Sequence, residues 1–312
     1  MRSLALLAVL AVGAALAVVV ASGPGSRAAG ATGATPGTTG AAPGATGVAP
    51  GATGASSGLP AGGELVYSNL PPDTSGLPVA LFESYAIAEF GGEVQLAGSG
   101  RSNPVVSVLM ASYACQHGQG PGCRTSPGAS FSWPLTLEIY RTGPRDDRGP
   151  LLARVTRRFR IPYRPSARGA CPDEGWTQGF GARCEFAQLH FVNFSFPRLT
   201  LPSRVILGLA FETADYGIEP VGKPGPYNQL GVAVAADYVC RRLRAHNECL
   251  AGRYANAAKA DPSVGSDPLP DQVYINTNYA PLPCGGLAGS FGPTGPCWTH
   301  EQPVVEIRAS GA

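Results

Sequence analysis

Eight cysteines fall into four pairs whose members lie close together in the sequence, and this arrangement constrains the chain most. The pairs are Cys115/Cys123, Cys171/Cys184, Cys240/Cys249 and Cys284/Cys297. An even number of cysteines that bracket polar or Gly/Pro-rich stretches is typical of disulfide bonds in an exported protein. We therefore predict four sequential disulfides that clip long loops, each stabilising the fold by about 2.5 to 3 kcal/mol through loop entropy.

The N-terminus carries an export signal by its composition. Arg2 precedes an unbroken apolar run from Leu4 to Ala21, and small residues follow. This order is typical of a secretory signal peptide, which we assign to residues 1–28. The alternative is an uncleaved anchor, because the run approaches the roughly 20 residues that span a bilayer. We predict an extracellular or cell-surface location, in a bacterium by composition, with membrane contact only if the segment is retained.

The next part of the chain consists almost entirely of small residues and proline. Residues 29–63 use little but Gly, Ala, Thr, Pro and Ser, with Gly-Ala-Thr-Gly recurring. Such a segment has almost no apolar surface to bury, so we predict a disordered linker. Residues 64–312 are then long enough for one large domain.

Apolar residues in this domain alternate with polar residues at a period of two. In the run from Leu135 to Tyr140, one face carries Leu135, Leu137 and Ile139. Alternation of this kind predicts half-buried antiparallel strands. The predicted strands are 64–69, 93–97, 105–113, 135–140, 155–161, 186–192, 205–211, 230–236, 273–276 and 304–307. They predict an all-β, two-sheet antiparallel sandwich of the jelly-roll type with long disulfide-clipped loops. A short helix is predicted only within 241–259.

Charge argues against a nucleic-acid partner. Without residues 1–28 the chain has 21 basic and 21 acidic residues, since only Arg2 and Arg27 are removed. A neutral net charge argues against nucleic acid or an anionic membrane as the main partner.

Arginines form the first candidate binding surface. Alternation places Arg154, Arg158 and Arg160 on one strand face, opposite Val155, Phe159 and Ile161. A row of guanidinium groups can bind the carboxylates or phosphates of an anionic polymer. The alternative is that Glu138 and other acids on adjacent strands neutralise the row as cross-strand pairs.

Aromatic residues near turns and cysteines form the second candidate. Trp176 lies between Cys171 and Cys184, Trp298 follows Cys297, and Trp133 and Tyr227 neighbour proline-containing turns. Flat aromatic rings can stack on sugar rings, so these residues are candidate glycan contacts. The alternative is that each packs against the fold, as tryptophans beside half-cystines do.

Catalytic and metal-binding motifs are absent from the sequence. Its one Gly-x-Ser-x-Gly match, at 54–58, lies in the predicted disordered linker and follows no predicted strand, so it is not a nucleophile elbow, and there is no His-Glu-x-x-His and no phosphate-binding glycine loop. We predict no catalytic residue, no cofactor and no metal, since Cys-x-x-His spacings in an exported chain favour disulfides over zinc. The remaining metal hypothesis is a calcium ion bound by Asp261, Asp267 and Asp271, which crowd one turn-rich stretch.

Three runs carry a resemblance: 89–98, 135–140 with 160–163, and 201–206. In these the chain resembles uncharacterised secreted bacterial β-sandwich proteins. The resemblance implies export and a sandwich fold and identifies no site residue. We therefore expect a secreted or cell-surface, non-catalytic binding module, with a polysaccharide such as a cell-wall glycan as ligand. The alternatives are a sandwich-fold glycan hydrolase or lyase and a structural cell-envelope protein. The sequence predicts no oligomeric state.

Overall fold

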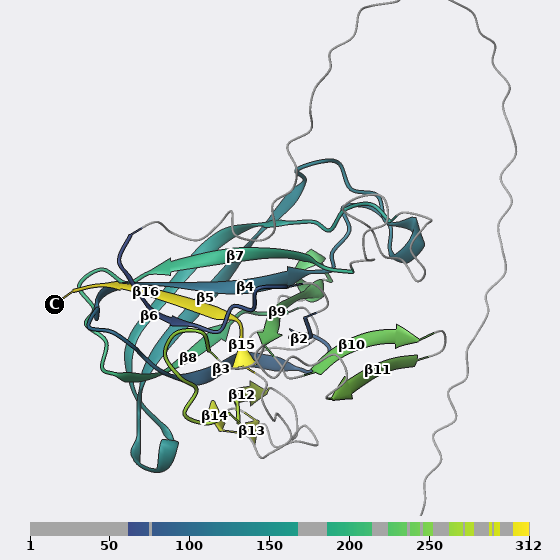
Figure 1. Ribbon diagram of the computed structural model, residues 1–312. Coiled ribbons are helices and arrows are strands. Elements are labelled where there is room, and N and C mark those ends of the chain that lie inside the picture. The colour runs from purple at the N-terminus through teal and green to yellow at the C-terminus, as the bar shows by residue number, and fades with distance from the viewer. Residues whose placement is uncertain are drawn as a thin grey trace, which may run out of the picture. The chain divides into compact units, whose positions relative to one another are not determined.

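A computed structural model describes residues 62–74, 77–167, 186–213, 224–235, 238–243, 246–251, 262–270, 272–277, 287–288, 290–293 and 302–311. The predicted signal peptide, almost all of the predicted linker, and Cys171, Cys184, Cys284 and Cys297 lie outside these residues. Most strands of the described part of the chain lie in two sheets, with β7, β4 and β16 in one layer and β6, β5, β8 and β3 in the other (Figure 1).

The first sheet contains seven described strands, of which five form its main path. In order these are β1 (Glu64–Ser68), β16 (Val305–Ser310), β4 (Ser102–Ser112), β9 (Leu230–Ala235) and β15 (Gln302–Pro303). Two further strands pair with this path, β2 (Val79–Leu81) with β9 and β7 (Gln188–Ser195) with β4. All of these pairings are antiparallel.

The second sheet also contains seven described strands. Its path is β13 (Leu287–Ala288), β12 (Tyr274–Thr277), β3 (Ile87–Gln95), β8 (Arg204–Ala210), β5 (Ser130–Thr142) and β6 (Arg148–Pro162), with β14 (Gly292–Pro293) pairing with β12. The central pairings are antiparallel, and only the short β12–β13 pairing is parallel. The fold is therefore an all-β, two-sheet antiparallel sandwich, as predicted, and its jelly-roll connectivity stays a prediction.

The hydrophobic core lies between the two sheets. It is formed by the alternate residues that face inward, among them Val106 and Val108 on β4, and Leu135, Leu137 and Ile139 on β5. Phe159 of β6 packs edge-to-face on Phe194 of β7, with ring centroids 5.0 Å apart, which joins the sheets along one side.

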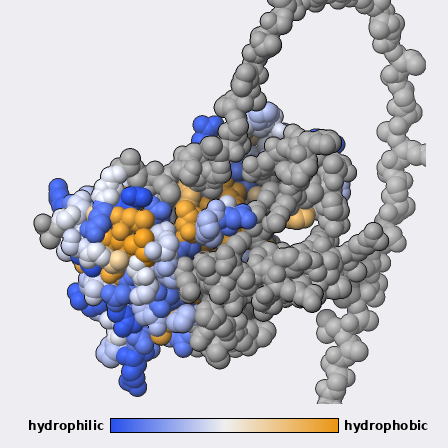
Figure 2. Space-filling model, in the orientation of Figure 1, coloured by the Kyte–Doolittle hydropathy of each residue, from blue (hydrophilic) through white to orange (hydrophobic). Residues whose placement is uncertain are grey.

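The outer face of the first sheet also carries apolar side chains. Leu109 and Val304 are fully buried there, and Leu70, Leu77 and Phe191 pack against them half-buried. Figure 2 shows hydrophobic surface over the region where Figure 1 labels β7, β4 and β16. Among the described residues no helix is both long enough and apolar enough to cross a membrane.

All ten predicted strands are present with shifted ends, whereas the predicted helix within 241–259 is wrong in its described part. Residues 238–243 and 246–251 form the antiparallel pair β10 (Tyr238–Leu243) and β11 (His246–Ala251). Pairing places Cys240 opposite Cys249 and satisfies the backbone hydrogen bonds between strands. The near-helical spacing of a few apolar residues carries too little apolar surface to outweigh this pairing.

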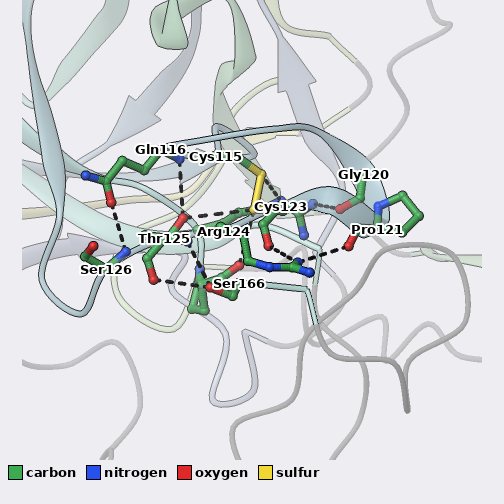
Figure 3. Close-up of a disulfide and its surroundings, with 11 residues drawn as sticks. Cys115, Gln116, Gly120, Pro121, Cys123, Arg124, Thr125, Ser126 and Ser166 are labelled. Atoms are coloured by element: carbon green, nitrogen blue, oxygen red, sulfur yellow. Dashed lines mark hydrogen bonds between the residues drawn. A yellow bond between two sulfur atoms is a disulfide. The ribbon is translucent and has the colours of Figure 1, made fainter. Parts of the chain in front are cut away.

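The disulfide between Cys115 and Cys123 is confirmed, with the two Cα atoms 5.5 Å apart. Several hydrogen bonds within this region, and bonds between Thr125 and the nearby residue Ser166 of the same chain, hold the closed loop in place, as Figure 3 shows. The amide of Thr125 donates to Oγ of Ser166 at 2.9 Å, and that of Ser126 donates to Oε1 of Gln116 at 2.9 Å. Among the described residues no cysteine is free.

Candidate functional site

The outward-facing side of the second sheet carries an unusual set of acidic and aromatic residues. Strand alternation sends Phe90 and Val94 of β3 into the core and leaves Glu89 and Glu93 on the outer face. On β5 the same alternation places Glu138 and Tyr140 on that face. The strand β8 lies between β3 and β5 and pairs with both. The register of these two pairings brings the four residues close together.

Glu89 and Glu138 form a buried pair, which we call the carboxyl pair. Each residue is 7% exposed, and the two carboxyl groups hydrogen-bond to each other. The hydroxyl of Tyr140 lies between them, 3.0 Å from Oε1 of Glu89 and in close contact with Oε2 of Glu138. A tyrosine hydroxyl has one proton, so it can donate to only one of these oxygens. A proton on Glu89 completes the hydrogen bonds of all three groups.

Glycine makes room for this pair on β8. A methyl group at Gly208 would overlap Oε1 of Glu89 and would lie 3.0 Å from Cζ of Phe291. The Glu89 carboxyl therefore lies over the backbone of β8, and the Phe291 ring lies beside the same glycine. Phe291 is 3% exposed and packs against Tyr140 and Tyr274, with ring centroids 5.6 Å and 5.8 Å away.

Only one member of the carboxyl pair, Glu138, forms an ion pair with a base among the described residues. Nε of Arg154 on β6 forms an ion pair with Oε1 of Glu138 at 2.7 Å. Burial, and then the charge of Glu138, raise the pKa of Glu89 to about 8, while Arg148 and Arg154 act in the opposite direction. Glu89 is therefore a neutral acid at pH 7 beside a carboxylate that has an arginine partner.

A second acidic group lies farther along β3. Glu93 is fully buried, and its Oε1 accepts bonds from Nη2 of Arg204 at 2.6 Å and from Oγ1 of Thr142 at 2.9 Å. Arg204 also binds Asp146 at 3.0 Å, and the Tyr274 hydroxyl lies 3.3 Å from Oε2 of Glu93. Burial raises the pKa of Glu93 despite these bonds. It likewise raises the pKa of Tyr274.

The arginine row lies on the same outer face, on β6. Arg154, Arg158 and Arg160 point outward and are exposed, as predicted. Arg154 is neutralised by Glu138, as the cross-strand alternative proposed, although Glu138 is buried. Nη1 of Arg158 lies 3.5 Å from the Ser132 carbonyl oxygen, and Nε of Arg160 donates to Ser130 Oγ at 2.6 Å. Neither residue forms an ion pair within the part of the chain that the structure describes.

Trp133 and Tyr227 are brought together by the fold. Their rings stack with centroids 3.7 Å apart and planes 13° apart, and Nε1 of Trp133 donates to the Glu212 carbonyl at 3.2 Å. Trp133 also packs against the core from the inward-facing side of β5. One face of each ring is therefore used by the other ring, so a glycan contact here is restricted to the remaining surface of the stack.

Several predicted site residues lie outside the described residues, namely Trp176, Trp298, Asp261 and Asp271. Asp267 is described, and its Oδ1 accepts a hydrogen bond from the Leu269 amide at 2.9 Å, as in a turn. Within the described ranges no three His, Cys, Asp or Glu residues lie together as potential metal ligands.

No local sequence pattern identifies Glu89, Tyr140 and Phe291 as a group. Glu89 and Glu93 are four residues apart on one strand, so their common face could be inferred from alternation. Their proximity to Glu138 depends on the β3–β8–β5 order, which no local pattern encodes. In comparisons with known proteins, no family model, curated protein or solved structure matches the chain.

Proposed function

We propose that residues 64–312 form an extracellular, non-catalytic binding module for an acidic polysaccharide, and that Arg158 and Arg160 contact the acidic groups of the polymer. The observation that carries this proposal is that two exposed arginines of one row have no acidic partner among the described residues, while the third has one. Side chains two residues apart on a strand are about 6.6 Å apart along the strand, so both can reach one extended polymer.

The chemistry of these side chains favours carboxylate groups of the polymer. A guanidinium group presents parallel N–H donors that match the two oxygens of a carboxylate. The Nη groups of Arg160 have no partner in the described part of the chain, because its only described bond uses Nε. Thr136 and Thr156 extend the same exposed face, with their hydroxyls 2.8 Å apart, and offer hydroxyl contacts to a sugar.

The carboxyl pair argues against the glycan hydrolase alternative. Glycosidases need two carboxyl groups separated by about 5 to 5.5 Å for retention or about 6.5 to 9.5 Å for inversion. Glu89 and Glu138 hydrogen-bond to each other, so no sugar or water can lie between them. Both are also 7% exposed. This geometry supports a binding module over a hydrolase.

The proposal is tested by comparing the mature protein with the Arg158→Ala/Arg160→Ala variant. We expect the mature protein to bind polygalacturonate more tightly than a neutral glucan in titration calorimetry, and the binding to weaken as salt is raised. The double variant should weaken polygalacturonate binding at least about tenfold, since each lost charge-assisted hydrogen bond contributes about 1.5 kcal/mol or more.

A matched control separates these contacts from net charge. Arg141→Ala/Arg157→Ala removes the same charge from exposed positions on the other face of β5 and β6, and it should bind normally. If both double variants lost the same amount of binding affinity, the effect would come from net charge and not from specific contacts. Unchanged binding in Arg158→Ala/Arg160→Ala would disprove the proposed contacts, and a preference for neutral glucan would favour an aromatic site such as Trp176.

A further inference from the structure

The outer face of the second sheet also contains an arrangement whose stability depends on one proton. Most of the acidic groups on this face have a basic partner. Glu138 is paired with Arg154, and Arg204 is shared by Glu93 and Asp146. Arg148 lies over the Tyr140 ring, with its Cζ 5.1 Å from the ring centroid. Glu89 has no hydrogen-bonded base among the described residues, and its described partners are a tyrosine and another acid.

Ionised Glu89 would be an uncompensated charge in an enclosed space. The residue is 7% exposed and its carboxyl lies over Gly208, next to the Phe291 ring. Burying an unpaired carboxylate costs several kcal/mol, and its repulsion with Glu138 adds to that cost. The carboxylate can lower this cost by reaching water, which requires the side chains that cover it to move.

Phe291 is the covering side chain that can move most easily. The strands β3, β8 and β5 are central and paired on both sides, whereas Phe291 precedes the two-residue strand β14, which pairs only with β12 among the described strands. Its ring rests on Tyr140, Tyr274 and Ile206 through apolar contact alone. Short peripheral elements open at lower free energy than central strands.

We propose that the carboxyl pair with Tyr140 is a proton-operated latch: a protonated Glu89 keeps the Phe291 segment, residues 290–293, seated on the second sheet, and loss of this proton releases it. The groups that face Glu89 are Glu138 and Tyr140 on β5, Arg148 and Arg154 on β6, and Asn276, its register partner on β12. Glu93, Arg204, Asp146 and Tyr274 form the neighbouring network on the same face.

The pKa of Glu89, which burial raises to about 8, gives the direction and range of the response. Because an exposed Glu89 has the lower pKa of an ordinary carboxyl, the opening equilibrium of the segment rises by up to about tenfold for each pH unit below pH 8, and it levels off above pH 8, where Glu89 is ionised in both states. Release should therefore develop mainly between about pH 6 and pH 8.

The experiment is hydrogen exchange of the mature protein between pH 6 and pH 9, followed by mass spectrometry and corrected for the intrinsic pH dependence of exchange. We expect the peptide that contains Phe291 to lose protection by up to about tenfold per pH unit between pH 6 and pH 8 and to lose little more between pH 8 and pH 9, while a peptide from β7 keeps its protection. In Glu89→Gln, which has no ionisable group at this position, the Phe291 peptide should keep the same protection across the range.

Two controls keep this test decisive. Glu306→Gln changes another buried glutamate, which pairs with Arg308 on the first sheet, and should leave the pH response of the Phe291 peptide unchanged. Carbon-13 NMR of the Glu89 carboxyl in the unmodified protein should give a midpoint near pH 8 and does not depend on any variant folding. Constant protection of the Phe291 peptide in the unmodified protein, or the same loss in Glu89→Gln, would overturn the latch.

Discussion

His190 lies on the core-facing side of β7, in register with Met110 of β4. Both of its ring nitrogens are buried without a hydrogen bond of normal geometry among the described residues. Burial lowers the pKa of this imidazole to about 4, and the backbone of Gln188 opposes the shift only in part. Folding therefore requires the neutral ring, whereas the unfolded chain can protonate it below about pH 6.5.

We predict that this histidine makes the domain sensitive to acid. Above pH 6.5 the imidazole is uncharged in both the folded and the unfolded state, so it does not change the unfolding free energy. As pH falls toward 4, only the unfolded chain takes up the proton, and this destabilises the fold. A folded-state pKa of about 4, in place of about 6.5 in the unfolded chain, corresponds to a loss of about 3 kcal/mol of unfolding free energy at low pH. His190→Leu should remove this part of the loss in calorimetric melts between pH 7 and pH 4.

The control for this prediction is His117→Gln, because His117 is exposed in the Cys115–Cys123 loop and its replacement should leave the pH profile as it is. If His190→Leu lost as much stability between pH 7 and pH 4 as the unmodified protein, groups other than His190 would cause the acid sensitivity. Glu89 does not obscure the comparison, since its raised pKa has the opposite effect. Its proton stabilises the fold most fully below about pH 4.5, and this stability decreases toward pH 8.

At the scale of elements, the Cys115–Cys123 loop is held by more than its disulfide. His117 and Arg124 exchange two backbone hydrogen bonds, at 3.0 and 2.9 Å. Oγ of Ser166 binds both the amide and the carbonyl of Thr125. Nη2 of the buried Arg164 donates to the Gly120 carbonyl at 3.1 Å. These bonds give the loop its conformation, and the disulfide limits the freedom of the unfolded chain.

We predict that Cys115→Ala/Cys123→Ala costs about 2.5 kcal/mol of unfolding free energy, the value expected for closing a loop of about nine residues. The loop should keep its folded conformation in the variant, because its hydrogen bonds persist. Urea unfolding gives the free energy, and exchange protection of the Thr125 and Ser126 amides reports the conformation. Loss of that protection would mean that the disulfide, and not the hydrogen bonds, determines the loop conformation.

The glycines of β3 and β8 act at the same scale. A methyl group at Gly91 would overlap the carbonyl oxygen of Leu207, so the two strands can approach closely only with glycine there. At Gly208 the missing side chain leaves space for the Glu89 carboxyl. Taken alone, both glycines weaken a strand. In the sheet they allow the strand contact and the carboxyl pair.

At the scale of the whole molecule, the predicted linker and the sandwich should be thermodynamically independent. Residues 29–63 lack the apolar side chains that would let them pack on a folded domain. We predict that residues 64–312 melt within about one degree of residues 29–312 in calorimetry at neutral pH. A decrease of several degrees on truncation would instead mean that the segment packs on the domain.

Local alternation was sufficient to determine much of the fold. The inward positions Leu135, Leu137 and Ile139 and the outward positions Arg154, Arg158 and Arg160 were assigned correctly, because successive side chains of a strand point to opposite faces. The pairing of Cys115 with Cys123 could likewise be predicted, since eight residues of separation leave few other geometries in a turn. These features depend on neighbours in the sequence, and the sequence by itself determined them.

The carboxyl pair was decided by the tertiary structure alone. Glu89 and Tyr140 are 51 residues apart, and they meet because β8, which is later in the sequence than both, inserts between β3 and β5. Strand order depends on which buried faces fit together over the whole core, and a period of two is the same for every order. Burial of Glu89 and the proton that it retains follow from that order, so only the assembled sheet turns an ordinary surface glutamate into a neutral acid.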